Sequence, residues 1–443
     1  MRSAVSGSVP APHPAVRAPS PIPPGSGPTP PPPEPISPEA VRRLFPAVTA
    51  AAEVYLDSAS TTQKPAPVIA AVEGYLRERT ANAGRGTYPW ATTLTGAIEH
   101  VRAQVAAHLR AAPEEIVFTP GATAGLNAVA LSWGLANLED GDEILYSPRD
   151  HASNVYPWLH LRDMLARFGR RIRLIPYRVT ELGEADTVDI AARLSPRTRL
   201  ITVSHLHHVF GALNTLEELR GRLDPRILLC FDCSQSGGHL PIDVTELRAD
   251  FAVLSAHKMF GAPGTGILHC SRRVHEQLVP FLPGGNSGVA PTDSNLEYAR
   301  MPERLEGGTH NIPGILAIGA ALNVLDEIGV DVIAEHNRVL TRRLIEGLRP
   351  LPGLEFTPGP AYAPCEIGYG TVSFTLAGIG STDLGFVLAE AGFLVRTGAH
   401  CVPPADGRAD ADSVRVSTHI YTTADDIDRF VDTLAAIARE VGP

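Results

Sequence analysis

Lysine is nearly missing from this sequence. Only two of its 38 basic residues are lysines, Lys64 and Lys258, and the others are arginines. Arginine replaces lysine where only a positive charge is needed, but a guanidinium stays protonated and cannot attack a carbonyl as a free amine. Lys258, between a Ser-x-His segment and a glycine-rich turn, therefore suggests imine chemistry. The alternative is that a high-GC genome favours arginine codons and Lys258 is a remnant, so its neighbours must decide.

Other features are also scarce, and each absence excludes a class of protein. Five cysteines in 443 residues do not make a disulfide framework, and their odd number is typical of a reducing cytoplasm, where we expect this protein. There is no apolar run of about eighteen residues and no apolar signal segment, so we expect no membrane span and no secretion. A net charge of −10 without a basic cluster argues against nucleic acids and anionic membranes as partners.

Two short clusters have the residue types of metal sites, but neither predicts one. Cys230 and Cys233 have the spacing of a zinc knuckle, yet they follow a strand pattern in which residues three apart point to opposite faces. No second cysteine pair follows them. The histidine cluster at 205–208 has no acidic or cysteine partner nearby. We therefore predict no metal site.

The composition divides the chain into segments. Residues 1–36 are rich in proline, serine, alanine and glycine, which predicts a disordered or polyproline tail. Residues 50–310 alternate apolar strands with helices, which predicts a large α/β domain whose mostly parallel sheet is covered on both faces. Residues 311–443 predict a smaller α+β domain, and we expect residues 37–49 to pack with it.

The predicted elements place the polar residues at one edge of the large sheet. We expect strands at 115–119, 143–146, 171–176, 200–205, 227–232 and 251–255, and a helix at 215–223. In the smaller domain we expect helices at 313–328 and 382–390, strands at 372–374, 394–396 and 414–417, and a last helix capped by Thr423 and Asp426. Ligands bind at the C-terminal ends of such strands. The polar residues at these ends are Thr123, His151, His208, Asp232, Ser255, His257 and Lys258.

These residues meet the needs of an imine cofactor that has a phosphate and a pyridinium nitrogen. Lys258 supplies the amine, and Asp232, at the end of a strand, supplies a carboxylate for the ring nitrogen. The turn 121–123 opens a helix whose N–H groups and hydroxyl can hold a phosphate. Ser255 and His257 flank the lysine and can donate to the same phosphate. Neither glycine-rich turn ends in Gly-Lys-Ser/Thr, so we do not predict ATP binding.

Five motifs carry a resemblance that extends over residues 55–441. They are Asp57-Ser58-Ala59-Ser60-Thr61-Thr62-Gln63-Lys64-Pro65, Asp232-Cys233-Ser234-Gln235, Ser255-Ala256-His257-Lys258, Glu306-Gly307-Gly308-Thr309 and Arg396-Thr397-Gly398-Ala399-His400-Cys401. With them the chain resembles the pyridoxal-phosphate enzymes of aminotransferase class V, most closely the group II cysteine desulfurases and selenocysteine lyases.

The resemblance implies a pyridoxal-phosphate-dependent transferase fold of type I and a set of cofactor contacts. Lys258 would bind pyridoxal 5'-phosphate as an imine, and Asp232 would pair with its ring nitrogen. Gln235 would bind the ring hydroxyl, where His208 also occupies a contact position. Three residues would hold the phosphate: Thr123, Ser255 and His257.

The resemblance also implies a substrate, a second subunit and a nucleophile. Arg415 would clamp the carboxylate of an amino-acid substrate, with Arg396 nearby, and Thr309 would reach the phosphate of the other subunit of a homodimer. Arg415 as a mere surface charge is the alternative. Cys401 would attack the sulfur of the bound cysteine, leaving alanine and a Cys401 persulfide that a sulfur-acceptor protein could discharge.

Cys401 and its neighbours leave an alternative open. His400 and Arg396 would favour the thiolate form of Cys401 and contact the substrate. The other interpretation is a structural cysteine buried in a loop before Pro403-Pro404.

Three departures from the family pattern leave the reaction open. Ala152 stands where the family has a histidine that stacks on the ring and is an acid/base candidate. Either His151 shifts to stack there and serves as the acid or base, or the stacking group is lost. His207-His208 replaces a Ser-Asn pair, and Ala399-His400-Cys401 replaces His-His-Cys. A second hypothesis is thus another class V reaction, such as C–S lysis of a cysteine conjugate, epimerisation, transamination or decarboxylating deamination. A third, a cofactor-free scaffold, conflicts with the intact Lys258 and Asp232.

Overall fold

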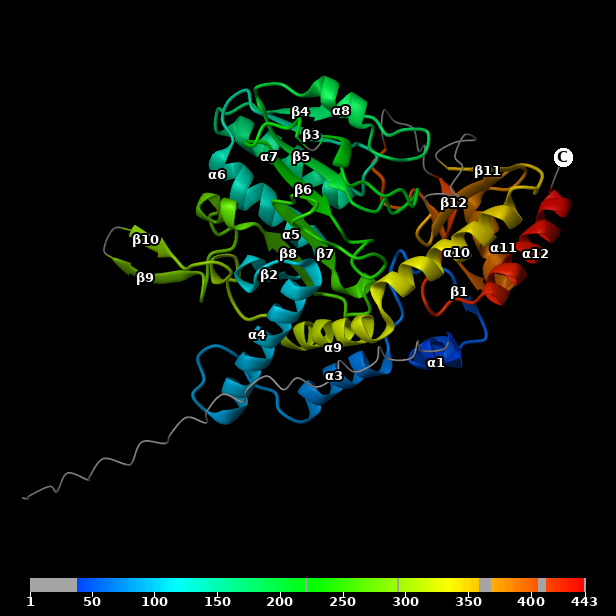
Figure 1. The fold of residues 1–443 in the computed structure, drawn as a ribbon, viewed down its shortest axis with the longest axis horizontal. Coiled ribbons are helices and arrows are strands. Elements are labelled where there is room, and N and C mark those ends of the chain that lie inside the picture. Colours follow the sequence, from blue (N-terminus) through cyan, green and yellow to red (C-terminus); the bar gives the residue numbers. More distant parts are fainter. Residues whose placement is uncertain (1–37, 220, 293–294, 358–367, 405–411, 442–443) are drawn as a thin grey trace, which may run out of the picture. The chain divides into compact units, whose positions relative to one another are not determined.

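The computed structural model describes residues 38–219, 221–292, 295–357, 368–404 and 412–441. They belong to one compact unit, residues 36–443. The tail predicted at 1–36 lies outside the described residues. The α/β class predicted from the sequence is confirmed, because a large, mostly parallel sheet is joined to a smaller antiparallel one (Figure 1). The predicted boundary between the two domains near residue 310 stays a prediction.

The large sheet has seven strands in the order β2-β8-β7-β6-β5-β3-β4. Their bounds are β2 Ile116–Thr119, β3 Glu143–Tyr146, β4 Arg173–Pro176, β5 Thr198–Ser204, β6 Leu228–Asp232, β7 Phe251–Ser255 and β8 Gly266–Cys270. Strands β4, β3, β5, β6 and β7 pair in parallel, and β8 runs antiparallel to both β7 and β2. The C-terminal ends of β5, β6 and β7 therefore meet at one edge of the sheet.

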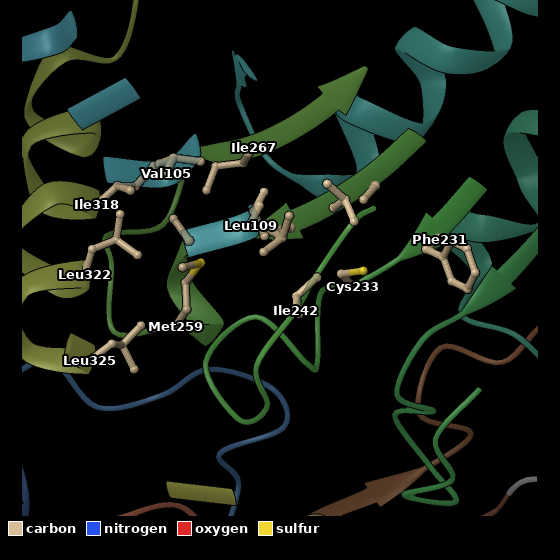
Figure 2. Packing of buried hydrophobic residues seen from close by; sticks show 14 of the residues in the cluster. Val105, Leu109, Phe231, Cys233, Ile242, Met259, Ile267, Ile318, Leu322 and Leu325 are labelled. Atoms are coloured by element: carbon tan, nitrogen blue, oxygen red, sulfur yellow. The ribbon is translucent and has the colours of Figure 1, made fainter. Parts of the chain in front are cut away.

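Both faces of the large sheet are buried, which explains the continuous apolar runs of its strands. In β6, Leu229 and Phe231 belong to one hydrophobic cluster, and Leu228 and Cys230 belong to the cluster on the other face. Figure 2 shows the first of these clusters, where Leu109, Ile267 and Ile318 come from a helix, a strand and a second helix. Successive strand residues thus pack against helices on opposite sides.

Nine α-helices and a separate pair of strands complete the large part of the fold in the described residues. The helices are α1 Pro38–Arg43, α2 Pro46–Ala50, α3 Ala66–Arg77, α4 Pro89–Leu109, α5 Ala122–Ala128, α6 Leu135–Asn137, α7 Tyr156–Arg167, α8 Thr187–Arg193 and α9 Ile312–Ile328. Helices α4 and α9 lie side by side over one face, with α3 next to α9, and α5 and α7 cover the other face (Figure 1). Strands β9 Gly288–Thr292 and β10 Asn295–Tyr298 form an antiparallel pair.

The smaller sheet has the order β11-β12-β15-β14, and its neighbouring strands pair antiparallel. Its strands are β11 Leu354–Phe356, β12 Thr371–Leu376, β14 Arg396–Gly398 and β15 Ser413–Ser417, and its helices are α10 Val330–Leu348, α11 Ser381–Glu390 and α12 Ala424–Val441. Beside it, β1 Val54–Tyr55 pairs in parallel with β13 Phe393–Leu394. The predicted cap of the last helix is confirmed, because the backbone N–H groups of Thr423 and Asp426 each bond the other's side chain.

The described part of the N-terminal segment, residues 38–49, contacts the large part of the protein as well as the smaller one. Arg42 forms an ion pair of 2.9 Å with Asp426, at the start of α12. The ring of Phe45 packs against both Phe260 of the large part and Tyr421. The segment therefore lies between the connection that follows β7 of the large sheet and the one that follows β15 of the smaller sheet. No helix in the described part of the chain has the length and apolar character needed to cross a membrane.

Two sequence predictions were wrong in their local structure. The helix predicted at 215–223 is only a 3-10 turn, Glu217–Leu219, in the described residues, because Leu216 has a φ of 53° and Gly221 one of 82°. The strand predicted at 394–396 is divided into β13 and β14, which belong to different sheets. Strand β8 was not predicted, since it follows β7 without a helix between them and so breaks the strand–helix alternation.

A buried ion pair joins the helix layer to the edge of the large sheet. Arg102 of α4 donates two hydrogen bonds, of 2.8 and 3.0 Å, to Glu306, and both side chains are at most 4% exposed. Arg102 also donates to the carbonyl of Ile116, while Glu306 accepts from the backbone N–H of Phe118. Burial raises the pKa of Glu306, but the hydrogen bond with His310 and the charge of Arg102 together hold this pKa below its usual value.

We expect Glu306→Gln to lower the free energy of unfolding by about 3 kcal/mol, because it removes the buried partner charge of Arg102 and leaves only the more exposed Glu99 paired with the guanidinium. Urea denaturation followed by circular dichroism measures this loss. The control is Arg343→Ala, which removes an exposed ion pair with Asp428 and should cost at most about 1 kcal/mol. Equal losses in the two variants would contradict the expectation.

Candidate active site

An open cavity of about 780 Å³ lies at the C-terminal edge of the large sheet, and residues of the smaller sheet close its other side. The structure brings every predicted site residue except Thr309 to its wall. From the large part these are Thr123, His151, His208, Asp232, Gln235, Ser255, His257 and Lys258, and from the small part Arg396, His400, Cys401 and Arg415.

Lys258 ends the 3-10 turn Ala256–Lys258, directly after β7. The other lysine of the chain supports this turn, because Lys64 donates hydrogen bonds of 2.8 Å to the carbonyl of His257 and 2.7 Å to that of Thr62. Burial and the nearby Arg415 lower the pKa of Lys258 to about 8. Much of its amine is therefore neutral, and hence nucleophilic, near pH 8.

Asp232 is the last residue of β6 and is 6% exposed. Its Oδ1 accepts two hydrogen bonds from Ser234, one from the backbone N–H at 3.0 Å and one from the hydroxyl at 2.5 Å. The side-chain amide of Gln235 donates to the carbonyl of Ala59 at 2.6 Å. Asp232 is thus oriented by the turn that follows its own strand, and Gln235 is tied to the segment that crosses from the small sheet.

The beginning of α5 forms a polar end of the cavity. Ala122 and Thr123 line it, and the hydroxyl of Thr123 lies 2.7 Å from that of Ser153. The helix start approaches the sheet closely because β8 has a glycine there: a Cβ on Gly266 would lie 2.6 Å from the Cα of Gly121. Ser153 was not predicted as a site residue. The sequence signal that could have found Ser153 is its place in the family motif. It directly follows Ala152, where this chain departs from the family pattern.

Arg415 reaches the cavity from β15 and is 3% exposed, which excludes the alternative of a surface charge. One terminal nitrogen donates to Asp57 at 3.2 Å and to the hydroxyl of Ser60 at 2.7 Å, and the other donates to the carbonyl of His208 at 3.1 Å. Its Nε is buried without a partner among the described residues. Arg396 lies 3.9 Å from the same Asp57 carboxylate, which sequence reasoning did not assign to the site.

His151 is held in one orientation. Its Nδ1 accepts a hydrogen bond of 3.1 Å from the backbone N–H of Ser153, and its ring meets that of His208 edge to face at 5.1 Å. Burial, followed by the charge of Lys258, lowers the pKa of His151 to about 4. At neutral pH the ring is therefore uncharged with its hydrogen on Nε2.

Cys401 lies on a tight turn between β14 and β15. The turn is closed by a hydrogen bond of 2.9 Å from the N–H of Val402 to the carbonyl of Ala399. Cys401 is exposed, which excludes the alternative of a buried structural cysteine. The side chain of His400 points back to Ser413, and burial lowers the pKa of His400 to about 3. The neutral His400 cannot supply the positive charge that the sequence suggested for the thiolate.

Thr309 lies apart from this cavity. It lines a separate cavity of about 580 Å³ with Asn82, Arg85 and Asn286. Its predicted contact, with the phosphate bound by the other subunit, stays a prediction.

The arrangement combines an amine of lowered pKa, a buried carboxylate, hydroxyls at a helix start, a buried guanidinium and an exposed thiol. Proteins of known family resemble this chain in sequence and in fold. The family model of aminotransferase class-V matches residues 54–430. A cysteine desulfurase from Klebsiella pneumoniae is 35% identical over 417 residues, which cover 92% of this chain and 99% of that protein. A probable cysteine desulfurase from Methanothermobacter thermautotrophicus is 34% identical, with 90% and 98% covered.

The fold comparison agrees with the sequence comparison. The apo structure of a cysteine desulfurase from Thermococcus onnurineus superposes with a TM-score of 0.83 at 28% identity, covering 91% of this chain and 98% of that one. The chain therefore belongs to the aminotransferase class-V family, whose members are pyridoxal-phosphate-dependent enzymes.

Proposed function

We propose that this enzyme is a cysteine desulfurase that transfers the sulfur of L-cysteine to Cys401. The observation that carries the proposal is that an exposed thiol lies on the wall of the same cavity as Lys258, Asp232 and Arg415. Similarity to cysteine desulfurases over about nine-tenths of the chain supports it.

The cavity fits pyridoxal 5'-phosphate in its donors and charges. Lys258 would bind it covalently, Asp232 would hold the ring nitrogen, and Gln235 would contact the ring hydroxyl. The phosphate would lie at the start of α5, within reach of Thr123, Ser255 and His257. When bound, the cofactor supplies an electron sink that stabilises negative charge at the α-carbon of an amino acid.

Arg415 is the proposed clamp for the substrate carboxylate. Its Nε is buried and has no partner among the residues that the structure describes, so a carboxylate can satisfy this donor. Asp57 and Ser60 hold the guanidinium in place, and Arg396 adds a second positive charge. This arrangement favours an amino acid with a free carboxylate.

Cys401 is the proposed nucleophile. Its thiolate attacks the sulfur of the bound cysteine, an S–S bond forms, and the C–S bond of the substrate breaks. The electron pair of the broken bond stays with the carbon, which gains a proton to give alanine, and Cys401 is left as a persulfide. The step balances without another oxidant or reductant. His151, uncharged and held by Ser153, is the proposed proton carrier at the cavity.

A second candidate is C–S cleavage of a cysteine conjugate by elimination, without a persulfide. It is favoured by the His151 ring at the cavity, because its Nε2–H can donate a hydrogen bond to the thiolate that leaves such a substrate. In this reaction Cys401 would not be needed.

We also propose a sulfur-acceptor protein and a second subunit as partners, and a cytoplasmic location. A persulfide on the exposed Cys401 would suit transfer to a sulfur-acceptor protein, and the Thr309 loop would complete the site of a second subunit in a homodimer. The described cysteines Cys230, Cys233, Cys270 and Cys401 are free thiols, which supports a cytoplasmic location.

Covalent attachment of pyridoxal phosphate to cofactor-free protein should speed up as the pH rises through about 8, because only the neutral amine of Lys258 attacks and burial lowers its pKa to that value. The growth of the visible absorption band measures the rate. Lys258→Arg keeps the charge but should show no band. Lys64→Arg is the matched control and should keep the band. A band that survives in Lys258→Arg would refute the assignment.

Cys401→Ser should reduce sulfide release from L-cysteine, in the presence of dithiothreitol, by at least about a hundred-fold, since a hydroxyl is a poor nucleophile toward sulfur. The visible band of the bound cofactor should stay unchanged. The control is Cys270→Ala, which should retain activity. Cys270 is buried and lies at the end of β8 away from the cavity, because Gly266 at the other end packs against the start of α5. If Cys401→Ser releases sulfide at the wild-type rate, elimination is the correct mechanism.

A further inference from the structure

The turn that carries Cys401 is attached to the large part of the protein at both of its central residues. The carbonyl of His400 accepts a hydrogen bond of 2.9 Å from Nε2 of His208. The carbonyl of Cys401 accepts one of 2.8 Å from the backbone N–H of Ala152. Two segments that follow β5 and β3 thus hold a turn that belongs to the smaller sheet.

The turn needs such support because its backbone is unfavourable for the residues in it. His400 has a φ of 48° and Cys401 a φ of 63°. Residues with side chains rarely adopt positive φ, and a turn with positive φ at both central positions prefers Asn-Gly. Neither His400 nor Cys401 provides that preference, so external hydrogen bonds must stabilise the conformation.

His208 is itself well fixed. It is 4% exposed, its ring stacks on that of His207 at 4.8 Å, and the ring of His207 stacks on Phe210 at 4.1 Å. His151 packs against the ring of His208 from another side. Burial, together with the neighbouring His207, keeps the pKa of His208 far below its usual value, so the ring is neutral with its hydrogen on Nε2. It therefore acts as a constant donor to His400.

We propose that His208 is a positioning residue for Cys401: its Nε2–H holds the turn in the conformation that keeps the thiol at the cavity. The catalytic consequence rests on the proposed function, in which Cys401 is the nucleophile. The structural consequence does not, because it concerns the turn alone. This role of His208 is separate from the ring-hydroxyl contact predicted from the sequence.

The test compares His208→Gln with His208→Asn in the cofactor-loaded enzyme. The amide nitrogen of glutamine can occupy the place of Nε2, whereas that of asparagine is one methylene too short. Both variants lose the same ring stacking on His207 and keep the carbonyl that accepts from Arg415, so they are matched in all other contacts of this residue.

Hydrogen–deuterium exchange gives the structural readout. In His208→Asn, the N–H groups of Ala152 and Val402 should exchange about three- to ten-fold faster than in His208→Gln, the effect expected for one lost neutral hydrogen bond. Exchange in β6 should be the same in both variants and serves as the control for global stability. Equal exchange of Ala152 and Val402 in the two variants would overturn the proposal.

Turnover of L-cysteine gives the catalytic readout. The kcat should be about three- to ten-fold lower in His208→Asn than in His208→Gln, with KM unchanged because the contacts of Arg415 are kept. Equal kcat values would show that His208 does not position the nucleophile. If the wild-type enzyme does not turn over L-cysteine, the proposed function fails, and the exchange experiment alone decides the role of His208 in the turn.

Discussion

The parallel pairing of β5, β6 and β7 is the constraint on which the site depends. In this register Ser204 lies opposite Asp232, and Asp232 opposite Val253, so the polar residues that end these strands meet at one edge. Because both faces of these strands are buried, a shift of register would disrupt side-chain packing on both faces of the sheet. The carboxylate and the amine are therefore held in place by the same core that stabilises the sheet.

The second half of the site comes from the smaller sheet, and a buried charge joins the two halves. Arg415 on β15 contacts Asp57 and Ser60, which precede the large sheet, and also the carbonyl of His208 in the segment that follows β5. Burial lowers the pKa of Arg415, and the neighbouring Asp57 offsets part of that effect. The pairing that offsets the burial of the guanidinium also holds Arg415 on the wall of the cavity that Lys258 lines.

The departures from the family pattern meet at one place. Ala152 and His208 both contact the turn of His400 and Cys401, although these segments are far apart in the sequence. A substitution in any one of them therefore changes the support of the turn that carries Cys401 as well as the cavity wall. The three departures, at Ala152, His207-His208 and Ala399-His400-Cys401, are therefore physically connected.

The sequence alone determined the fold class and much of the cavity wall. Strand patterns ending in Asp232 and Ser255, a rare lysine after Ser-x-His and a glycine-rich turn before Thr123 are local signals, and periodicity shows which strand ends carry them. Local structure that depends on single backbone angles could not be predicted from these patterns. The helix expected at 215–223 is replaced by a 3-10 turn next to Leu216, which has a positive φ.

Only the tertiary structure decided how the residues act on one another. It showed that His400 turns toward Ser413 and is neutral, that Lys64 supports the turn of Lys258, that Asp57 pairs with Arg415, and that His208 bonds the turn of Cys401. These contacts join residues many positions apart, and burial sets their charge. A sequence determines which groups are available, whereas their pKa values and hydrogen bonds depend on packing that forms only when the two sheets come together.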